Sequence, residues 1–470
     1  MSPSPHPFDV ACAHARTFRR SLPRRRPRPE IDAAALEARF GGPTPEAGED
    51  PAAVIDALAL AAGPGLMASP GPRFFGWVIG ASHEAGVAAD WLASAWGQNA
   101  GLYACSPAAA TAEKVSARWL LDILRLPEDC SVGFTTGATM ASVTCLAAAR
   151  SEVLARAGWD VEGHGLQGAP RVRILLGADA HTTIFAGLRL LGFGSATAEK
   201  VATDSEGRMI PAALAKALES DSGPTIVIIQ AGQINTGAFD PAAEIAALCR
   251  THGAWLHVDG AFGLWARAVP EFAHLTAGLE EADSWSTDGH KWLQTPFDSG
   301  FAIVSNIAAH RRAMAIGASY LPEDGYQPSH FAPELSRRAR GFSSWAILRT
   351  LGRSGIQEMV RTHCAYAREL AATLSAAGGI EVVNEVVLNQ VALRFGNDDE
   401  LTRAVIRQMQ ADNVCFVEGG SWHGQWVMRV SVISGPLTRT DMHRLSRAIL
   451  SAWKAVQTRQ HSPLPETSAI

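Results

Sequence analysis

Lys291 has the surroundings expected of a reactive lysine rather than a solvated one. It lies between His290 and Trp292, after a short polar stretch, residues 282–289, that lacks the period of an amphipathic helix. A lysine held in a pocket can present a neutral amine, which attacks a carbonyl carbon and forms a Schiff base. The sequence therefore predicts that Lys291 anchors a carbonyl compound covalently.

Pyridoxal phosphate is the carbonyl compound expected for such a lysine. It needs an acid at its ring nitrogen, a flat group over its ring and donors for its phosphate. Residues 254–263 read as a short apolar strand that ends in Asp259 and continues through small residues. Because the ligand-binding groups of an open α/β sheet lie at the carboxyl ends of its strands, Asp259 is expected to hold the ring nitrogen.

Donors for the phosphate are predicted in residues 133–142, where a strand passes through small residues into a helix that continues to residue 157. The first amides of a helix have no partner within it and face a positive helix terminus, so the turn can bind an anion. Many small-residue turns only reverse the chain. The Lys291 hypothesis makes this one a phosphate site, with the backbone amides of Ala138 and Thr139 as donors.

A histidine, His181, follows the predicted strand 171–176 and opens the next helix. By itself, a histidine at such a turn is more often structural than catalytic. In combination with Asp259, Ala261 and the triplet centred on Lys291, it resembles the pyridoxal-phosphate-dependent group II amino acid decarboxylases, which include the aromatic-L-amino-acid and glutamate decarboxylases. The resemblance is strongest over residues 73–351.

The resemblance implies roles for these side chains. His181 would lie flat on the cofactor ring and handle protons at the reacting carbon. Ala261 and His290 would contact the cofactor. Asn235 is implied as a further cofactor contact, because residues 231–241 resemble an Asn-Thr-Gly-Ala turn of the family.

The irregular passage 315–335 is expected to be a functional loop. Tyr320 falls where the family keeps a loop tyrosine that protonates the carbon after carbon dioxide leaves, and an ordinary loop tyrosine is the alternative. Arg337 and Arg338 match a pair of arginines in the family. They are expected to hold the return of the loop rather than to touch substrate.

Residues 71–80 bring Phe75, Trp77 and Val78 close together between glycines. A structural aromatic cluster is one interpretation. The resemblance favours the other, in which these three residues line the pocket for the substrate side chain. Their apolar character predicts an aromatic or bulky apolar amino acid as substrate.

Three positions depart from the family. Met140 stands where an acid is usual, and Ile234 stands where animal aromatic-amino-acid decarboxylases carry threonine. Asp288 replaces an asparagine that contacts the phosphate in those animal enzymes. Because an acid aimed at phosphate would repel it, Asp288 is expected to be turned away or paired.

Strands that alternate with helices, and chemical groups at successive strand ends, predict an α/β fold with a mostly parallel sheet and right-handed crossovers. By resemblance it is the aspartate-aminotransferase-like fold (PLP fold type I), with seven strands. Three parts are expected: an N-terminal arm over 1–72 that packs on a partner subunit, a large cofactor-binding domain over 73–350, and a small α+β domain over 351–470. The family resemblance implies a homodimer with the active site near the interface.

The composition is that of a globular protein, with 470 residues, 47% hydrophobic and 19% charged. The net charge of −5 gives no reason to expect nucleic acid or a membrane as partner. Seven scattered cysteines without a C-x-x-C pair favour a reducing compartment over a disulfide framework or a zinc cluster. The start of the chain lacks an apolar signal core, and a cytoplasmic protein is expected.

The predicted reaction is decarboxylation of an L-amino acid to an amine and carbon dioxide through the Lys291 Schiff base. Because a fold does not determine a reaction, an aminotransferase, an aldehyde-forming oxidative deaminase and a carbon–carbon lyase remain open. Asp288 also gives weight to a catalytically silent binding relative. A metal-dependent hydrolase that uses His257, Asp259 and His290 is a further alternative, although its remaining ligands are absent at any usual spacing.

Overall fold

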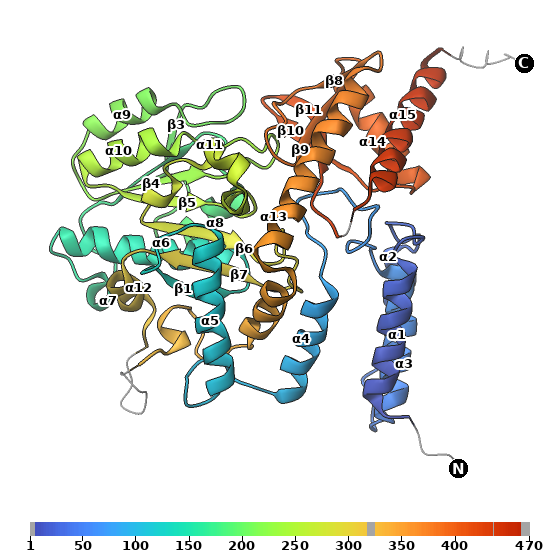
Figure 1. Ribbon diagram of the computed structural model, residues 1–470, viewed down its shortest axis with the longest axis horizontal. Helices are drawn as coiled ribbons and strands as arrows, with labels where there is room; N and C mark the ends of the chain where they lie inside the picture. Colours follow the sequence, from blue (N-terminus) through green and yellow to red (C-terminus); the bar gives the residue numbers. More distant parts are fainter. Residues whose placement is uncertain (1–4, 317–324, 436, 462–470) are drawn as a thin grey trace, which may run out of the picture.

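The computed structural model describes residues 5–316, 325–435 and 437–461 (Figure 1). Its larger sheet has seven strands in the order β1-β7-β6-β5-β4-β2-β3. Strand β7 runs antiparallel to both of its neighbours, and the remaining pairs are parallel. The strands are β1 (Ser131–Thr135), β2 (Arg173–Gly177), β3 (Glu199–Val201), β4 (Thr225–Gln230), β5 (Trp255–Asp259), β6 (Ser284–Asp288) and β7 (Gly300–Val304). The predicted α/β fold with a mostly parallel seven-stranded sheet is confirmed.

Helices cover both faces of this sheet, which explains why strands such as β4 and β7 are nearly continuous apolar runs. The side chains of β2 divide between two clusters of buried hydrophobic residues. Ile174 and Leu176 belong to the first cluster, and Leu175 belongs to the second. The first cluster includes α6 (Ala138–Arg156), α8 (Thr182–Leu190) and α12 (Ile307–Met314). The second includes α5 (Pro107–Ile123), α9 (Pro211–Glu219), α10 (Ala242–His252) and the first half of α13 (Arg340–Ser375). Two short helices, α7 (Val161–His164) and α11 (Ala273–Thr276), complete this part.

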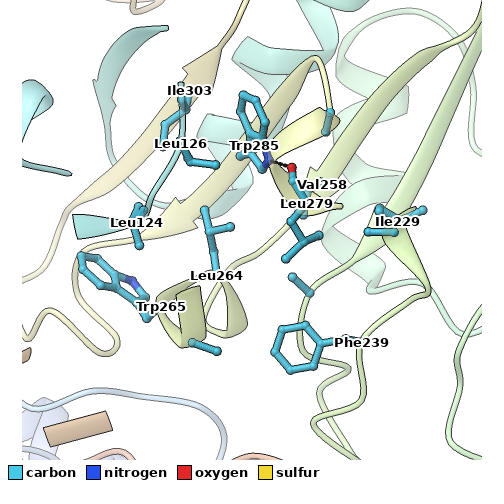
Figure 2. Packing of buried hydrophobic residues seen from close by; sticks show 14 of the residues in the cluster. Leu124, Leu126, Ile229, Phe239, Val258, Leu264, Trp265, Leu279, Trp285 and Ile303 are labelled. Carbon is cyan, nitrogen blue, oxygen red and sulfur yellow. Dashed lines mark hydrogen bonds between the residues drawn. The ribbon is translucent and has the colours of Figure 1, made fainter. Parts of the chain in front are cut away.

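The second cluster contains large aromatic side chains, among them Trp265, Trp285 and Phe239 (Figure 2). Trp265 and Trp285 are fully buried. Each indole nitrogen keeps a partner: Trp285 Nε1 donates to the Leu279 carbonyl at 2.7 Å, and Trp265 Nε1 donates to the Asp288 carbonyl at 3.1 Å. The core therefore anchors the end of β6, from which the Lys291 segment begins.

A second sheet, entirely antiparallel, has the order β10-β11-β9-β8. Its strands are β8 (Ile380–Val382), β9 (Gln390–Phe395), β10 (Glu418–Trp422) and β11 (Gln425–Ser431), with helices α14 (Asp399–Asp412) and α15 (Arg439–His461). Helix α13 joins the two sheets and is interrupted at Gly352, whose φ of 59° suits glycine. We retain the division at residue 350 as a proposal, and this interruption supports it.

The N-terminal segment forms α1 (Pro7–Ser21), α2 (Ala33–Phe40) and α3 (Pro51–Ala62), followed by α4 (Glu84–Trp96). Helix α3 begins at a capping residue, with Asp50 accepting the Ala53 amide at 3.0 Å and Pro51 in the first position. Helices α1 and α3 lie side by side at the edge of the molecule (Figure 1). No residue of α1 or α2 is buried, so this segment contributes little core within one chain. None of the helices in the described part of the chain is long and apolar enough to span a membrane.

Candidate active site

A cavity of about 440 Å³ lies where β1, β2, β5 and β6 end, and it contains Lys291. Because these four strands end at the same edge of the sheet, residues distant in sequence meet there. The predicted residues that line it are Val78, Ala138, Thr139, His181, Ala261, His290 and Lys291. The cavity is also lined by Ile79, Thr136, Gly137, Met140, Thr183, Asp288 and Phe297, which had not been assigned to the site.

Lys291 forms an ion pair at the floor of this cavity. Its Nζ lies 3.1 Å from Asp288 Oδ2, and its side chain is 18% exposed. The other carboxylate oxygen, Asp288 Oδ1, accepts the Ala138 amide at 2.5 Å and lies 3.2 Å from His290 Nε2. Asp288 is thus paired, as expected, but it is turned toward the helix terminus assigned to the phosphate rather than away from it.

His181 is held by the turn that it opens. It is the N-cap of α8, and its Nδ1 lies 2.7 Å from Thr183 Oγ1 and 3.4 Å from the Thr183 amide. Since Nδ1 accepts here, Nε2 carries the proton of the neutral ring. Burial is the main cause that lowers the pKa of His181, while the charge of Asp259 opposes it. His181 is therefore a neutral imidazole near pH 7.

Asp259 ends β5 and is 7% exposed. Burial raises the pKa of its carboxyl, and the nearby His181 and Lys291 charges and the Ala261 amide, 3.3 Å away, oppose the rise. A buried carboxylate with only one amide donor can gain from a cationic partner. Such a partner is what a protonated ring nitrogen would provide.

His290 forms one wall beside Lys291. Its Nδ1 accepts the Ser299 amide at 3.3 Å, and its ring lies 4.3 Å from the Phe297 ring, measured between centroids. Burial lowers the pKa of His290, and the Asp288 carboxylate works against that effect. The neutral ring can therefore serve as a flat contact beside the lysine.

Gly80 brings residues 78 and 79 against the lysine segment. A Cβ at this position would lie 2.0 Å from the Lys291 carbonyl oxygen and 2.6 Å from that of His290. Only glycine permits this approach without a shift of the backbone. The contact explains why Val78 and Ile79 line the cavity.

Two of the predicted pocket residues do not reach the cavity. Phe75 is 1% exposed and packs in the core of the C-terminal sheet, because its amide and carbonyl bond to Phe416 and Ser431 there. Trp77 is 43% exposed and packs on Phe416, with ring centroids 5.3 Å apart. Of the three residues, Val78 lines the cavity within this chain, and a substrate contact of Phe75 and Trp77 stays a prediction.

Asn235 also lies outside the lining of the cavity, buried in the turn after β4. Its side-chain oxygen accepts from Arg429 at 3.4 Å, and its amide donates to Gln233. The structure therefore gives it a contact to Arg429. Tyr320 lies outside the described residues.

Arg429, on β11, is the residue that sequence reasoning missed. Its Nε is buried and finds no hydrogen-bond partner within the described part of the chain. Burial lowers the pKa of Arg429, and its charge in turn lowers the pKa of His181. An incompletely paired guanidinium near His181 is suited to bind a carboxylate. Nothing in its local sequence, Met428-Arg429-Val430, signals this position.

Arg337 holds the chain where the 315–335 passage returns. Its guanidinium is fully buried, 2.9 Å from Glu113 on α5, and donates to the Ala100 and Phe134 carbonyls. Arg338 pairs with Asp90 at the surface. Both contacts agree with a role in anchoring the passage.

The residues at the cavity fit pyridoxal phosphate. A lysine amine and a neutral histidine line one space, and the buried acid Asp259 lies close to both. Thr136 and the first turn of α6, with Ala138 and Thr139, line the same space. These are the groups that the carbonyl, ring and phosphate of the cofactor require. His257, proposed for a metal site, is instead buried with Nδ1 2.9 Å from Ser284 Oγ. Among the described residues, no group of three or more His, Cys, Asp or Glu side chains is placed to hold a metal ion.

The fold and the lysine-centred cavity define a pyridoxal-phosphate enzyme of the aspartate-aminotransferase-like class. The family model described as "Pyridoxal-dependent decarboxylase conserved domain" matches residues 37–396. The chain therefore belongs to the family of pyridoxal-phosphate-dependent decarboxylases, which are carboxy-lyases.

Characterised relatives agree with this membership. The chain is 30% identical to the aromatic-L-amino-acid decarboxylase of Sus scrofa, over 79% of this chain and 80% of the relative. It is 26% identical to the 4-hydroxyphenylacetaldehyde synthase of Rhodiola rosea, over 94% and 91% of the two chains. The structure of Oryza sativa TDC with PLP and tryptamine superposes with a TM-score of 0.88, covering 98% of this chain and 100% of that chain at 23% identity, and so supports the same fold.

Proposed function

We propose that this chain decarboxylates an L-amino acid with an aromatic or bulky apolar side chain, releasing the amine and carbon dioxide. The observation that carries the proposal is the cavity in which Lys291 and His181 lie together, close to Asp259. Its apolar lining by Val78, Ile79, Met140 and Phe297 favours an apolar side chain. The name of the Sus scrofa relative supports the aromatic class.

Each residue of the site has a separate role in the proposed reaction. Lys291 would bind the carbonyl group, Asp259 the ring nitrogen and the α6 turn the phosphate, and the bound cofactor supplies the electron sink for the bond that breaks. His181 keeps a proton on Nε2 and can donate it at the reacting carbon. Arg429 would hold the substrate carboxylate, since its guanidinium is buried and only partly paired.

Aldehyde formation is the second candidate outcome. It is favoured by the overall similarity to the Rhodiola rosea 4-hydroxyphenylacetaldehyde synthase. In the family, the tyrosine position matched by Tyr320 supplies the proton that directs the reaction to the amine, so Tyr320→Phe is the informative variant. We propose the amine as the product because this tyrosine is present.

The assembly we propose is a homodimer in the cytoplasm. Apolar side chains of α3 and α4 are exposed in the single chain, among them Leu58, Leu60, Trp91 and Trp96. A partner subunit would bury them. The seven free cysteines support a reducing compartment.

The test combines spectra with product analysis. The purified protein is expected to show an absorption band near about 420 nm from a protonated Schiff base, and Lys291→Ala is expected to lack it. A panel of amino acids then identifies the substrate, and release of amine plus carbon dioxide is expected with L-tryptophan, L-tyrosine or L-phenylalanine. Turnover of L-glutamate or L-aspartate alone would overturn the substrate assignment, and aldehyde plus ammonia would overturn the outcome.

A further inference from the structure

Asp288 is delivered to the cavity by a main chain that is held on both sides. Its amide donates to the Ala261 carbonyl at 2.9 Å, and its carbonyl accepts Trp265 Nε1 at 3.1 Å. Its side chain is 4% exposed. The next residue, Gly289, is closely packed, because a Cβ there would lie 2.5 Å from Ser299 Oγ. The carboxylate therefore has a defined place rather than a range of positions.

That place is the N-terminus of α6. Asp288 Oδ1 accepts the amide of Ala138, the first residue of the helix, at 2.5 Å. Gly137, the N-cap residue, supplies no side-chain cap of its own. A Cβ on Gly137 would lie 3.2 Å from the same oxygen, so the glycine makes room for the carboxylate. An acid from β6 thus fills the first position of a site that favours anions.

The carboxylate also neutralises the charge beside it. Oδ2 lies 3.1 Å from Lys291 Nζ, and Oδ1 lies 3.2 Å from His290 Nε2. A phosphate group bound at the α6 turn would meet this carboxylate at the same helix terminus. Two anions at one partly buried terminus repel each other, and the first amide is already engaged.

We propose that Asp288 is an internal anion that weakens the hold on the cofactor phosphate, so that this enzyme binds and releases pyridoxal phosphate readily. The proposal rests on the assignment of the α6 turn as the phosphate site. It makes Asp288 a positioning residue for the cofactor, distinct from the residues that act on the substrate.

The test is equilibrium binding of two probes, pyridoxal phosphate and pyridoxal, to the cofactor-free full chain, followed by tryptophan fluorescence and absorbance. Asp288→Asn keeps the size of the side chain and removes its charge. We expect this variant to lower the Kd for pyridoxal phosphate by about tenfold, which is the effect of one charge at a partly buried site. The Kd for pyridoxal should change by less than about twofold. Asp122→Asn, on a 71% exposed carboxylate paired with Arg353, changes the net charge equally and should alter neither affinity.

Unchanged or weaker affinity of Asp288→Asn for pyridoxal phosphate would overturn the proposal. An equal gain in affinity for pyridoxal phosphate and for pyridoxal would also overturn the proposal, because the charge of Asp288 would then act through Lys291 and not on the phosphate. Asp288→Ala, with thermal melting of each variant, repeats the measurement if the first variant is unfolded. Failure of the unmodified chain to bind pyridoxal phosphate at all would count instead against the proposed function.

Discussion

Arg429 shows how a residue that looks ordinary in sequence can come close to His181 in the folded chain. It lies in a strand among apolar neighbours, and only the packing of β11 against the turn after β4 brings it near Asn235 and His181. By contrast, Lys291, Asp259 and His181 are recognisable because each lies in a short segment whose residue types are unusual for a solvated loop. Their roles follow from local chemistry, whereas that of Arg429 follows from tertiary structure.

Arg429→Gln is predicted to raise KM for the amino acid by about tenfold to a hundredfold, because a charge-assisted contact to the substrate carboxylate contributes about 1.5–3 kcal/mol. Cofactor binding, measured by the absorption band, should be retained. Steady-state kinetics beside the spectrum separate the two effects. An unchanged KM would remove Arg429 from substrate binding.

The places of Phe75 and Trp77 outside the cavity lining have the same physical origin. Phe75 and Trp77 stand three positions and one position before Val78, so all three were candidates for one wall. The extended chain pairs with the C-terminal part through Phe416, and this contact directs Phe75 into that core. Which side chain of an irregular segment faces a cavity is decided by such long-range contacts, which residue types do not report.

At the scale of elements, the apolar strands of the large sheet were expected from the sequence, whereas the polar strand β6 and the short strand β3 were not. Residues 254–259 were expected as an apolar strand that ends in Asp259, and residues 255–259 form β5, since an apolar run covered on both faces leaves a clear signal. Strand β10, Glu418–Trp422, was not expected, because its Gly-Gly-Ser centre is typical of a turn. Helix α1 was also missed, since arginines and flanking prolines obscured its pattern.

Gly80→Ala is predicted to displace the Lys291 segment, because the new Cβ would fall 2.0 Å from a backbone oxygen. Backbone must then move, and we expect a loss of about 2–4 kcal/mol of unfolding free energy together with weaker cofactor binding. Gly63→Ala is the matched control. A Cβ added at Gly63 would have no heavy atom within 4 Å, and the backbone there is helical, so this substitution should be neutral or slightly stabilising. Urea unfolding measures both, and equal stabilities would contradict the close approach at residue 80.

The ion pair between Glu113 and Arg337 fixes α5 to the chain that returns from the 315–335 passage. Both side chains are at most 1% exposed. Removing one partner leaves a buried charge without compensation, so Glu113→Ala should cost about 3–5 kcal/mol of unfolding free energy.

Asp122→Ala, on the same helix, provides the comparison for that variant. Asp122 pairs with Arg353 at the surface, with its side chain 71% exposed. An exposed pair of this kind contributes about 0–1 kcal/mol. Similar losses of unfolding free energy in Glu113→Ala and Asp122→Ala would show that burial does not make the Glu113–Arg337 pair more stabilising than a surface pair.

At the scale of the whole molecule, three fully buried histidines connect stability to pH. Burial lowers the pKa of His257 and of His310 to about 3, and that of His363 to about 4. In the unfolded chain they titrate near 6.5, so between pH 6.5 and 4 the unfolded state binds more protons than the folded state. Stability therefore falls as pH falls through this window.

The expected slope from three such groups approaches about 4 kcal/mol per pH unit once the unfolded chain is fully protonated. Chemical denaturation at pH 7, 6 and 5 measures it. His363→Gln, which can still accept from Trp292, should make the slope shallower by about a third if it folds. A stability that is constant from pH 7 to pH 5 would contradict the neutral state of these rings.

The cavity is lined by segments that range from residue 78 to residue 297, with Arg429 close by in a separate sheet. No early or partial structure of the chain can contain it, because closing such long loops comes late for chains of this kind. Capture of the coenzyme should therefore be one of the last events after synthesis. The absorbance of the bound cofactor would then report completed folding, because it should increase only after the helices and sheets have formed.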